Sequence, residues 1–395
     1  MKNFSEQNFE GKKVLVRVDF NVPLDEDFNV VDGSRIKASL PTLKKLIADK
    51  ARIILMSHLG RPKGVDVRYS LSHVVGYLQS LLGVNVSFSK SCVGEETKFH
   101  VKKLKKGEVL ILENLRFHKE EKSGDLGFSK KLADLADVYV NNAFGAAHRP
   151  HSSTSVIARF FPKERYFGLL LKKELDNLKT SFINAKKPLT AIIGGAKVSG
   201  KIDVLHSLVE KVDNLIVGGG MAYTFAKAMG GSVGISLVEI DKVDLAKSIV
   251  FKAKNNGVNL LLPIDSVNST HFNNTSKINH SKIENIPEGY MGLDIGKETI
   301  RVFSSIIEKS KTIIWNGPMG VFEMSNFENG TKKIAESVSR ATKNGAFSLV
   351  GGGDSVAAIN KLNLQNQVSY VSTGGGAMLE YLKGKELPAI KAVLK

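Results

Sequence analysis

The residues 347–359, FSLVGGGDSVAAI, show the pattern that decides the fold: a short apolar run, a glycine cluster and the start of a helical pattern. The same order begins again at Thr190 (TAIIGGAKVSGK), Asn214 (NLIVGGGMAYTF) and Val368 (VSYVSTGGGAM). Apolar runs without alternation are typical of strands that are buried on both faces, as in parallel sheets covered by helices. The sequence therefore predicts an α/β protein.

Six further apolar runs end in polar or glycine-rich residues. They are VLVRVDFNVP from Val14, RIILMSHLGRP from Arg52, VLILENLRFH from Val109, DVYVNNAFGAAHR from Asp137, NLLLPIDSV from Asn259 and TIIWNGPMGVFE from Thr312. Between the fourth and fifth runs along the chain, residues 167–187 place leucines at helical spacing, with Pro162 before and Pro188 after them. We predict two doubly wound parallel-sheet, Rossmann-like lobes (1–166 and 188–380), a connecting helix (167–187) and a tail (381–395) that packs back on the protein.

The composition excludes several classes of protein. The chain has 395 residues, 42% of them hydrophobic and 24% charged, which is an ordinary globular balance. No apolar run is long enough for a membrane span, and the first residues lack the apolar core of a secretory signal. Cys92 is the only cysteine, so no internal disulfide or iron–sulfur cluster can form. We expect a soluble, cytoplasmic protein that does not contact membranes.

Basic residues gather where the predicted strands of the first half end. In an open parallel sheet, ligands bind at the carboxyl ends of the strands, so these residues are candidates for a site. Arginine grips carboxylate or phosphate through two parallel hydrogen bonds, which predicts a small ligand with several negative charges. His148 and His151 lie three residues apart, but no carboxylate or cysteine at ligand spacing favours a metal. The candidate residues are Asp19, Asn21, Arg35, His58, Arg61, Arg116, Arg149 and the two histidines.

Glycine clusters end the strands of the second half. Glycine-rich turns that open helices are typical of nucleotide phosphate sites, because backbone N–H groups can approach the anion. The segment from Gly195 to Ile202, GAKVSGKI, has the spacing of a phosphate-binding P-loop, but Ile202 replaces the hydroxyl residue that binds Mg²⁺. Asp354, in GGGDS, is the best-placed carboxylate to bind the metal instead.

Two other functions compete with this interpretation. The formal net charge of +17 would suit a basic α/β protein that binds nucleic acid. The α/β pattern would also suit a dinucleotide-dependent oxidoreductase, but no Gly-x-Gly-x-x-Gly with an acidic residue about 20 positions later follows a predicted strand. Salt-dependent nucleic-acid binding and a nicotinamide absorbance assay would discriminate these alternatives.

The whole chain closely resembles the phosphoglycerate kinase family. The strings RVDFNVP, SHLGRP, LENLRFH, AFGAAHR, GGAKVSGKI, GGGMAYTF, WNGPMGVFE, GGGDS and STGGGA stand in family order and at family spacing. The resemblance implies an N-terminal lobe that binds 3-phosphoglycerate and a C-terminal lobe that binds Mg²⁺ with ATP or ADP, on two sides of a cleft. It implies a glycolytic phosphotransferase that moves a phosphoryl group between 1,3-bisphosphoglycerate and ADP, with hinge bending at the connecting helix, and we expect a cytoplasmic monomer.

The resemblance also assigns roles to individual residues. Substrate binding falls to Asp19, Asn21, Arg35, His58, Arg61, Arg116 and Arg149. Nucleotide binding falls to Gly195, Lys197, Lys201, Gly219, Gly292, Leu293, Asn316, Glu323, Gly352, Gly353, Asp354 and Ser355, with Asp354 as the metal ligand. Arg35, Lys197, Gly353 and Gly375 are the expected catalytic residues.

Two departures from the family pattern carry expectations. Asn142 stands where the family usually has aspartate. If that carboxylate orients the loop that carries Arg149, its replacement by an amide is expected to lower substrate affinity. Ser266 and Asn268 replace valine-like residues, which we interpret as drift at the edge of the nucleotide lobe. Because a substrate carboxylate is already ionised, the reaction needs no general base, and no group essential to the chemistry should titrate between roughly pH 6 and 8.5.

Overall fold

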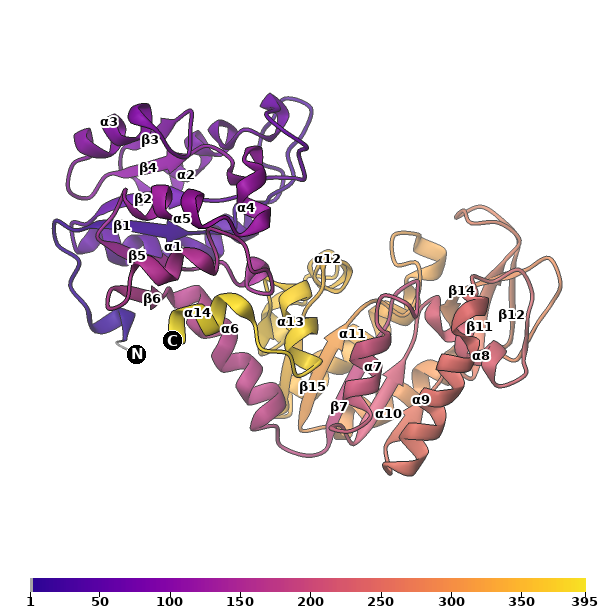
Figure 1. The fold of residues 1–395 in the computed structure, drawn as a ribbon. Coiled ribbons are helices and arrows are strands. Elements are labelled where there is room, and N and C mark those ends of the chain that lie inside the picture. Colours follow the sequence, from indigo (N-terminus) through magenta and orange to yellow (C-terminus); the bar gives the residue numbers. More distant parts are fainter. Residues whose placement is uncertain (1–2) are drawn as a thin grey trace. The chain divides into compact units, whose positions relative to one another are not determined.

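The computed structural model describes residues 3–395 as two compact units. The N-terminal unit runs to Leu175 and also includes Glu386–Lys395, whereas the C-terminal unit is Asp176–Lys385. Each unit contains a parallel sheet of six strands, and the strands alternate with helices along the chain (Figure 1). The predicted α/β fold with two doubly wound lobes is confirmed.

The sheet of the N-terminal unit has the strand order β3-β4-β2-β1-β5-β6, and all its pairs are parallel. Because β1 lies in the middle and the strands on either side arrive by crossovers, the chain reverses direction of winding there. The strands are β1 (Lys13–Arg17), β2 (Arg52–Met56), β3 (Val86–Ser89), β4 (Val109–Leu112), β5 (Val138–Asn141) and β6 (Arg165–Phe167). The helices are α1 (Ser34–Ala48), α2 (Val75–Leu82), α3 (Glu95–Lys103), α4 (Lys119–Ser123), α5 (Leu126–Ala133) and α14 (Pro388–Leu394).

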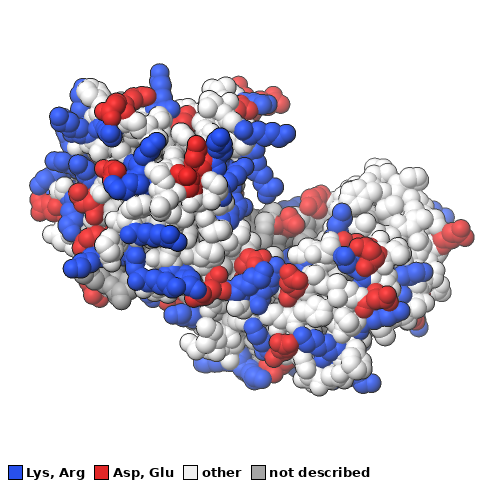
Figure 2. Space-filling view, in the orientation of Figure 1, with Lys and Arg blue, Asp and Glu red and all other residues white. Residues whose placement is uncertain are grey.

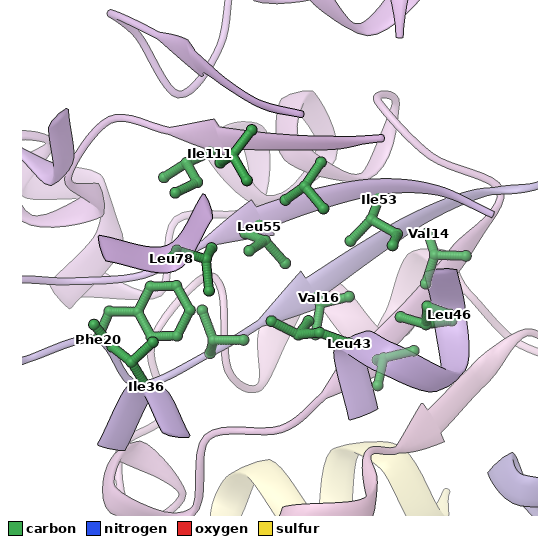
Figure 3. Packing of buried hydrophobic residues seen from close by; sticks show 14 of the residues in the cluster. Val14, Val16, Phe20, Ile36, Leu43, Leu46, Ile53, Leu55, Leu78 and Ile111 are labelled. Atoms are coloured by element: carbon green, nitrogen blue, oxygen red, sulfur yellow. The ribbon is translucent and has the colours of Figure 1, made fainter. Parts of the chain in front are cut away.

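The core of this unit forms between one face of the sheet and the helices α1 and α2. Alternate residues of the strands point to the same face, so Val14 and Val16 of β1 join this core while Arg17 belongs to the opposite face. Figure 3 shows these strand residues packed with Leu43 and Leu46 of α1. The burial of both faces explains why the strands read as continuous apolar runs.

The sheet of the C-terminal unit has the order β10-β8-β7-β15-β16-β17, again with parallel pairs. The strands are β7 (Leu189–Ile193), β8 (Asn214–Val217), β10 (Asn259–Leu261), β15 (Thr312–Asn316), β16 (Phe347–Val350) and β17 (Tyr370–Val371). The helices are α7 (Ile202–Leu208), α8 (Met221–Ala228), α9 (Val243–Asn255), α10 (Lys297–Lys309), α11 (Asn329–Lys343), α12 (Gly353–Lys361) and α13 (Gly375–Leu382).

Seven short strands were not among the ten that the apolar runs predict. Two are the edge strands β3 and β6 of the first sheet. The others form an antiparallel sheet of β12 (Ile278–Lys282), β11 (Asp265–Ser269) and β14 (Met291–Ile295), and a pair of β13 (Asn285–Ile286) with β9 (Ser232–Val233). These strands are short or polar, so they lack the continuous apolar signal of a buried parallel strand.

The predicted connecting segment contains helix α6 (Leu169–Leu178), which continues as the π-helical turn η7 (Lys179–Ile183). The last residues pack on the N-terminal unit: the Ala389 N–H donates to the Ala147 carbonyl over 3.1 Å, and Arg165 Nε donates to the Val393 carbonyl over 3.1 Å. No helix within residues 3–395 is both long and apolar enough to cross a bilayer.

The two units differ in composition. Nine of the eleven arginines lie in the N-terminal unit, whereas 24 of the 36 glycines lie in the C-terminal unit. Figure 2 shows the Lys and Arg side chains spread over the visible face of the N-terminal unit, with acidic residues between them. The scattered lysines form a solvated surface, whereas several arginines gather at one edge of the N-terminal sheet.

Candidate active site

Seven polar side chains meet at the carboxyl edge of the N-terminal sheet, and we call them the arginine edge. They follow β1, β2, β4 and β5, which are neighbours in the sheet order, so residues from distant parts of the sequence come together. Arg35 differs from the others because it lies in the first turn of α1 and not directly after a strand. The arginine edge comprises Asp19, Asn21, Arg35, His58, Arg61, Arg116 and Arg149.

Direct contacts tie the loops of the arginine edge together. Arg35 Nη1 donates to Asp19 Oδ2 over 2.8 Å. The loop after β2 is held from two sides at Gly60, because Asn21 Oδ1 accepts from its N–H over 2.7 Å and Arg116 donates to its carbonyl. These contacts fix the backbone that carries the cationic side chains.

The electrostatics of the arginine edge favour an anion. Burial, followed by the neighbouring charges of Arg149 and Arg17, lowers the pKa of Arg116 to about 10. Burial is also the main cause that lowers the pKa of Arg149, with Arg61 acting in the same direction and Asp19 opposing it. Cations that are crowded and partly buried gain from an anion that neutralises them, which is the physical reason to expect ligand binding here.

Sequence reasoning missed two buried charged residues behind this edge. Arg17 and Glu121 are each 1% exposed. Arg17 Nε donates to Ser153 Oγ over 2.8 Å, and Ser153 Oγ donates to Glu121 Oε1 over 2.6 Å, so a hydroxyl links the cation to the carboxylate. The sequence could have predicted a role for Arg17, because a charged residue at the end of an otherwise apolar buried strand indicates a function other than packing.

The carboxyl edge of the C-terminal sheet is built mainly from glycine turns, and we call it the glycine edge. Its residues follow five strands that are consecutive in the sheet, in the order β8, β7, β15, β16 and β17. Lys201 precedes α7, Gly353 opens α12 and Gly375 opens α13. The glycine edge comprises Gly195, Lys197, Lys201, Gly219, Asn316, Gly352, Gly353, Asp354, Ser355 and Gly375.

Glycine is required here because the turns pack backbone against backbone. Gly352 has φ = 100°, a conformation that favours glycine, and a Cβ built on Gly375 would lie 2.5 Å from the Gly352 Cα. The turns are also cross-linked: Asn316 Nδ2 donates to the Gly351 carbonyl over 2.9 Å, and Ser355 Oγ accepts from the Gly317 N–H. Ser355 and Asn316 therefore support the turns as well as being candidates for ligand contact.

A cavity of about 430 Å³ opens beside the glycine edge. Six of the predicted nucleotide residues line it: Gly195, Gly219, Gly292, Leu293, Glu323 and Asp354. Sequence reasoning missed the apolar part of its wall, which includes Tyr223, Leu237, Phe272 and Met291. Phe272 is 61% exposed although it lines the cavity, so its ring is available to a flat ligand. The polar loop around Phe272 gave no sequence signal for this role.

The two candidate lysines differ in environment. Lys197 is exposed, whereas Lys201 donates from Nζ to Asn316 Oδ1. Burial lowers the pKa of Lys201 to about 8, and the charge of Asp354 opposes this shift only in part. The pKa of Lys201 therefore lies within the window from pH 6 to 8.5, because burial of an amine disfavours its charged form. That no group essential to the chemistry titrates in this window stays a prediction.

The expected role of Asn142 in orienting the loop that carries Arg149 is wrong, whereas its effect on substrate affinity stays a prediction. Asn142 is buried, and its Oδ1 accepts from Thr42 Oγ1 over 2.9 Å and from the Leu170 N–H over 3.1 Å. It therefore holds the first turn of α6 and is not a partner of the loop that carries Arg149. Its Nδ2 is buried without a hydrogen-bond partner. The amide oxygen thus pairs with a free N–H at the helix N-terminus, but the amide's own N–H donors stay unpaired.

Ser266 and Asn268 are not drift at an edge, because both are buried. The hydroxyl groups of Ser266 and Tyr223 lie 3.0 Å apart, and Ser266 Oγ donates to the Asp294 carbonyl over 3.3 Å. Since Tyr223 lines the cavity, Ser266 supports the cavity wall. Asn268 Nδ2 donates to Ser281 Oγ over 2.9 Å and so holds β12 against β11.

Comparisons with known proteins agree with this geometry. The family model described as "Phosphoglycerate kinase" matches residues 4–385. The chain is 50% identical to a phosphoglycerate kinase of Porphyromonas gingivalis, with 98% of each chain covered. It is 51% identical to the cytosolic phosphoglycerate kinase 3 of Arabidopsis thaliana, with 98% of this chain and 96% of the relative covered.

Solved structures give the same result. The phosphoglycerate kinase of Coxiella burnetii superposes with a TM-score of 0.88 at 38% identity, covering 100% of this chain and 98% of that one. The enzyme of Pyrococcus horikoshii superposes with a TM-score of 0.87 at 31% identity, with the same coverage. The chain thus belongs to the phosphoglycerate kinase family of phosphotransferases.

Proposed function

We propose that the arginine edge binds 3-phosphoglycerate, and that the glycine edge with its cavity binds ATP or ADP, in the reversible transfer of a phosphoryl group. In the glycolytic direction, the acyl phosphate of 1,3-bisphosphoglycerate passes to ADP and gives 3-phosphoglycerate and ATP. The observation that carries this proposal is the chemical division of the two edges, because crowded arginines suit a small polyanion and glycine turns suit a nucleotide.

On the substrate side, Arg61, Arg116 and Arg149 supply charge for the phosphate and carboxylate groups. Asp19 and Asn21 would hydrogen-bond the glycerate, and His58 would donate from its ring. Asp19 also holds Arg35 through their 2.8 Å ion pair, so that guanidinium is aimed before substrate arrives. We propose that residues 1–166 form the lobe that carries these functions.

On the nucleotide side, Gly292 and Leu293 lie in the apolar cavity that would take the base, and Glu323 would bind the ribose. Lys197, Lys201, Gly195 and Gly219 would meet the phosphates, together with Asn316 and the turn Gly352, Gly353 and Ser355. This division follows the cavity, whose wall changes from apolar residues to glycines. We propose that residues 188–380 form the nucleotide lobe, with 167–187 as the connecting segment.

Asp354 fits a magnesium ion that is bound together with the nucleotide. Within residues 3–395, no three His, Cys, Asp or Glu side chains gather into a metal cluster of their own. Mg²⁺ in phosphoryl-transfer enzymes commonly takes one or two carboxylates and completes its shell with phosphates and water. Asp354 is exposed in the first turn of α12 and lines the cavity, so its carboxylate meets this requirement. When bound, the ion would neutralise charge on the phosphate oxygens.

The residues near the reaction would supply donors and cations only. The nucleophile in the reverse direction is a carboxylate that is ionised at neutral pH, so no general base is needed. Arg35 and Lys197 would neutralise the charge that spreads over the transferred group. The N–H groups of Gly353 and Gly375 begin helices α12 and α13, where backbone donors are free for an anion.

The other expectations follow from the family. Cytosolic relatives make the cytoplasm the proposed compartment, and the enzyme is proposed to act as a monomer. The basic nucleic-acid-binding alternative gains no support, because the arginines at the sheet edge account for the clustered charge.

A coupled assay tests the proposal. Purified protein with Mg²⁺, ATP and 3-phosphoglycerate should form ADP at a rate that saturates in both substrates. Omitting 3-phosphoglycerate, or replacing it with 2-phosphoglycerate, should remove most of the rate, because the arginine edge fixes the positions of the phosphate and the carboxylate. ADP formation that does not depend on 3-phosphoglycerate would refute the proposal.

A further inference from the structure

The buried residue Arg17 touches the only histidine of the arginine edge. Arg17 Nη2 lies 3.2 Å from His58 Nδ1, and both side chains are almost fully buried. We propose that Arg17 is a positioning residue for His58: it fixes the imidazole as the neutral tautomer with its hydrogen on Nε2, so that the ring offers an N–H to the substrate. This inference rests on the proposed binding of 3-phosphoglycerate at the arginine edge.

The chemistry of the two side chains determines the direction of the hydrogen bond. A guanidinium carries five N–H donors and no acceptor, and it stays charged in proteins. His58 Nδ1 must therefore accept, which requires a lone pair on Nδ1. A neutral imidazole with a lone pair on Nδ1 carries its hydrogen on Nε2. An imidazolium would place two donors against each other at this contact.

Within residues 3–395, Asp19 is the only carboxylate that lies within 4.0 Å of His58 Nδ1 and could favour the opposite tautomer. Its Oδ1 lies 3.9 Å from Nδ1, which is beyond hydrogen-bond distance, and its Oδ2 already accepts from Arg35. Arg17 Nη2 is closer to the same nitrogen. The geometry thus gives Nδ1 a donor at hydrogen-bond distance, whereas the Asp19 carboxylate lies beyond that distance.

The remaining contacts hold Arg17 in this position. Its Nη1 donates to the Val18 carbonyl and its Nε donates to Ser153 Oγ, so three of its groups have fixed partners. Glu121 balances the charge through the Ser153 hydroxyl, and its Oε2 also accepts from the Ser153 N–H over 3.0 Å. A charged side chain that is fully buried, bonded at three points and balanced can set the state of its neighbour.

The surroundings of His58 work in the same direction. Burial lowers the pKa of His58 well below its usual value, and the charges of Arg17, Arg116, Arg149 and Arg35 add to this effect. The acidic group that faces the ring is Asp19, whose Oδ1 lies 3.9 Å from Nδ1. A neutral Nε2–H donor contributes a hydrogen bond to an anion at every pH from 6 upward, whereas a titrating imidazolium would make substrate affinity depend on pH.

The first test reads the tautomer directly in the full-length enzyme without ligand. ¹⁵N NMR of the histidine rings, assigned with the His58→Gln variant, should show a pyridine-like Nδ1 and a pyrrole-like Nε2 for His58, unchanged between pH 6 and 8.5. A protonated Nδ1, or a titration in this range, would overturn the inference. Because no substrate is present, this result is independent of whether the proposed function is correct.

The second test removes the positioning group. In Arg17→Met, the Nδ1 position loses its donor, so the two ring nitrogens should share the proton and their ¹⁵N shifts should converge. The KM for 3-phosphoglycerate should rise about tenfold, while the KM for ATP stays unchanged. Arg17→Lys, which keeps a charge but not the planar fork, serves as a second variant if Arg17→Met does not fold.

Ser153→Ala is the matched control. It removes a partner of both Arg17 and Glu121 but leaves the contact between Arg17 and His58. Its His58 tautomer should match that of the wild type. If Arg17→Met keeps the wild-type tautomer, or if Ser153→Ala changes it as much as Arg17→Met does, then Arg17 has only a structural role and the inference fails.

Discussion

Both sheets are parallel and six-stranded, but their carboxyl edges carry different kinds of residues, and we propose that the edges bind anions in opposite ways. At the arginine edge, we propose that long side chains bring charge to the ligand, and their loops are held by contacts such as Arg116 to the Gly60 carbonyl. At the glycine edge, most positions lack a side chain, so backbone packs closely against backbone, as the contact of Gly352 with Gly375 shows. We propose that backbone N–H groups approach the ligand there. The fold positions an edge, and the residues at the strand ends decide what binds there.

The difference has an electrostatic consequence. At the arginine edge, burial and, after it, the charges of neighbouring arginines lower the pKa values of Arg116 and Arg149. The glycine edge uses dipoles of N–H groups with few charges, so its two lysines matter individually. Variants that remove one charge should therefore change different kinetic constants at the two edges, namely the KM for 3-phosphoglycerate at the arginine edge and kcat or the KM for ATP at the glycine edge.

The largest effect is expected at Lys197, the exposed cation of the glycine edge. Lys197→Met should lower kcat by roughly 100-fold or more, because a cation at the transferred group contributes most when charge spreads in the transition state. Thermal unfolding should hardly change, since the side chain is exposed. Lys254→Met, an exposed lysine in the last turn of α9, is the control. Normal turnover in Lys197→Met would remove Lys197 from the catalytic set.

A smaller effect, confined to one ligand, is expected at Arg149. Arg149→Ala should raise the KM for 3-phosphoglycerate roughly 10- to 100-fold, which is the usual cost of losing a hydrogen bond to a charged group. Nucleotide affinity, measured by calorimetry with ADP, should stay within error. Arg159→Ala removes an equal charge from an exposed position of the same unit and should change neither value. Equal losses for both ligands would contradict the division between the edges.

The pH dependence should distinguish the edges further. Phosphate binds the protonated amine of Lys201, whose pKa burial lowers to about 8, so nucleotide binding should weaken as pH rises through about 8. We expect the KM for ATP to rise up to about tenfold between pH 8 and pH 9.5, with kcat at saturation nearly flat between pH 6 and pH 8.5. Lys201→Arg keeps its charge in this range, so the increase should disappear. An unchanged increase in that variant would assign it to another group.

The smallest effect is expected at Asn142, which lies at the end of β5 near the arginine edge but contacts helix α6. Asn142→Asp removes the buried Nδ2 that lacks a partner and places a carboxylate at a helix N-terminus, so it should stabilise the fold by about 1 kcal/mol at neutral pH. If the helix lowers the pKa of this Asp, the gain is present above its unfolded pKa and is lost as pH falls through the folded value. Denaturant unfolding measures the gain, and the KM for 3-phosphoglycerate should not change. Higher substrate affinity would restore the original interpretation of Asn142.

Much of the fold was predictable from the sequence. All ten apolar runs are strands, because burial on both faces leaves a continuous apolar signal, as in VLILE before Asn114. The edge strand β6 and the polar strand β11 were missed, because neither sequence contains a continuous run of apolar residues. Tertiary pairing holds them in place, and a single sequence does not contain that information.

The site was predictable where function depends on position along a strand, and not where it depends on packing. Residues such as Arg116 and Asp354 follow strands, and topology places them at an edge. The hydroxyl pair of Tyr223 and Ser266, and the contact of Asn142 with α6, join residues that are far apart in the sequence. Such pairs have no local signature, so their roles had to be read from the structure.

We propose that each edge binds its own ligand, and one NMR titration of the full chain can show where each ligand binds. Amide spectra of the full chain would be followed while 3-phosphoglycerate alone, and then Mg·ADP alone, is added. We predict that 3-phosphoglycerate perturbs the loops around Asn21, Gly60 and Arg149, and that Mg·ADP perturbs those around Gly195, Gly219 and Gly353. Perturbation of the same edge by both ligands would contradict the account.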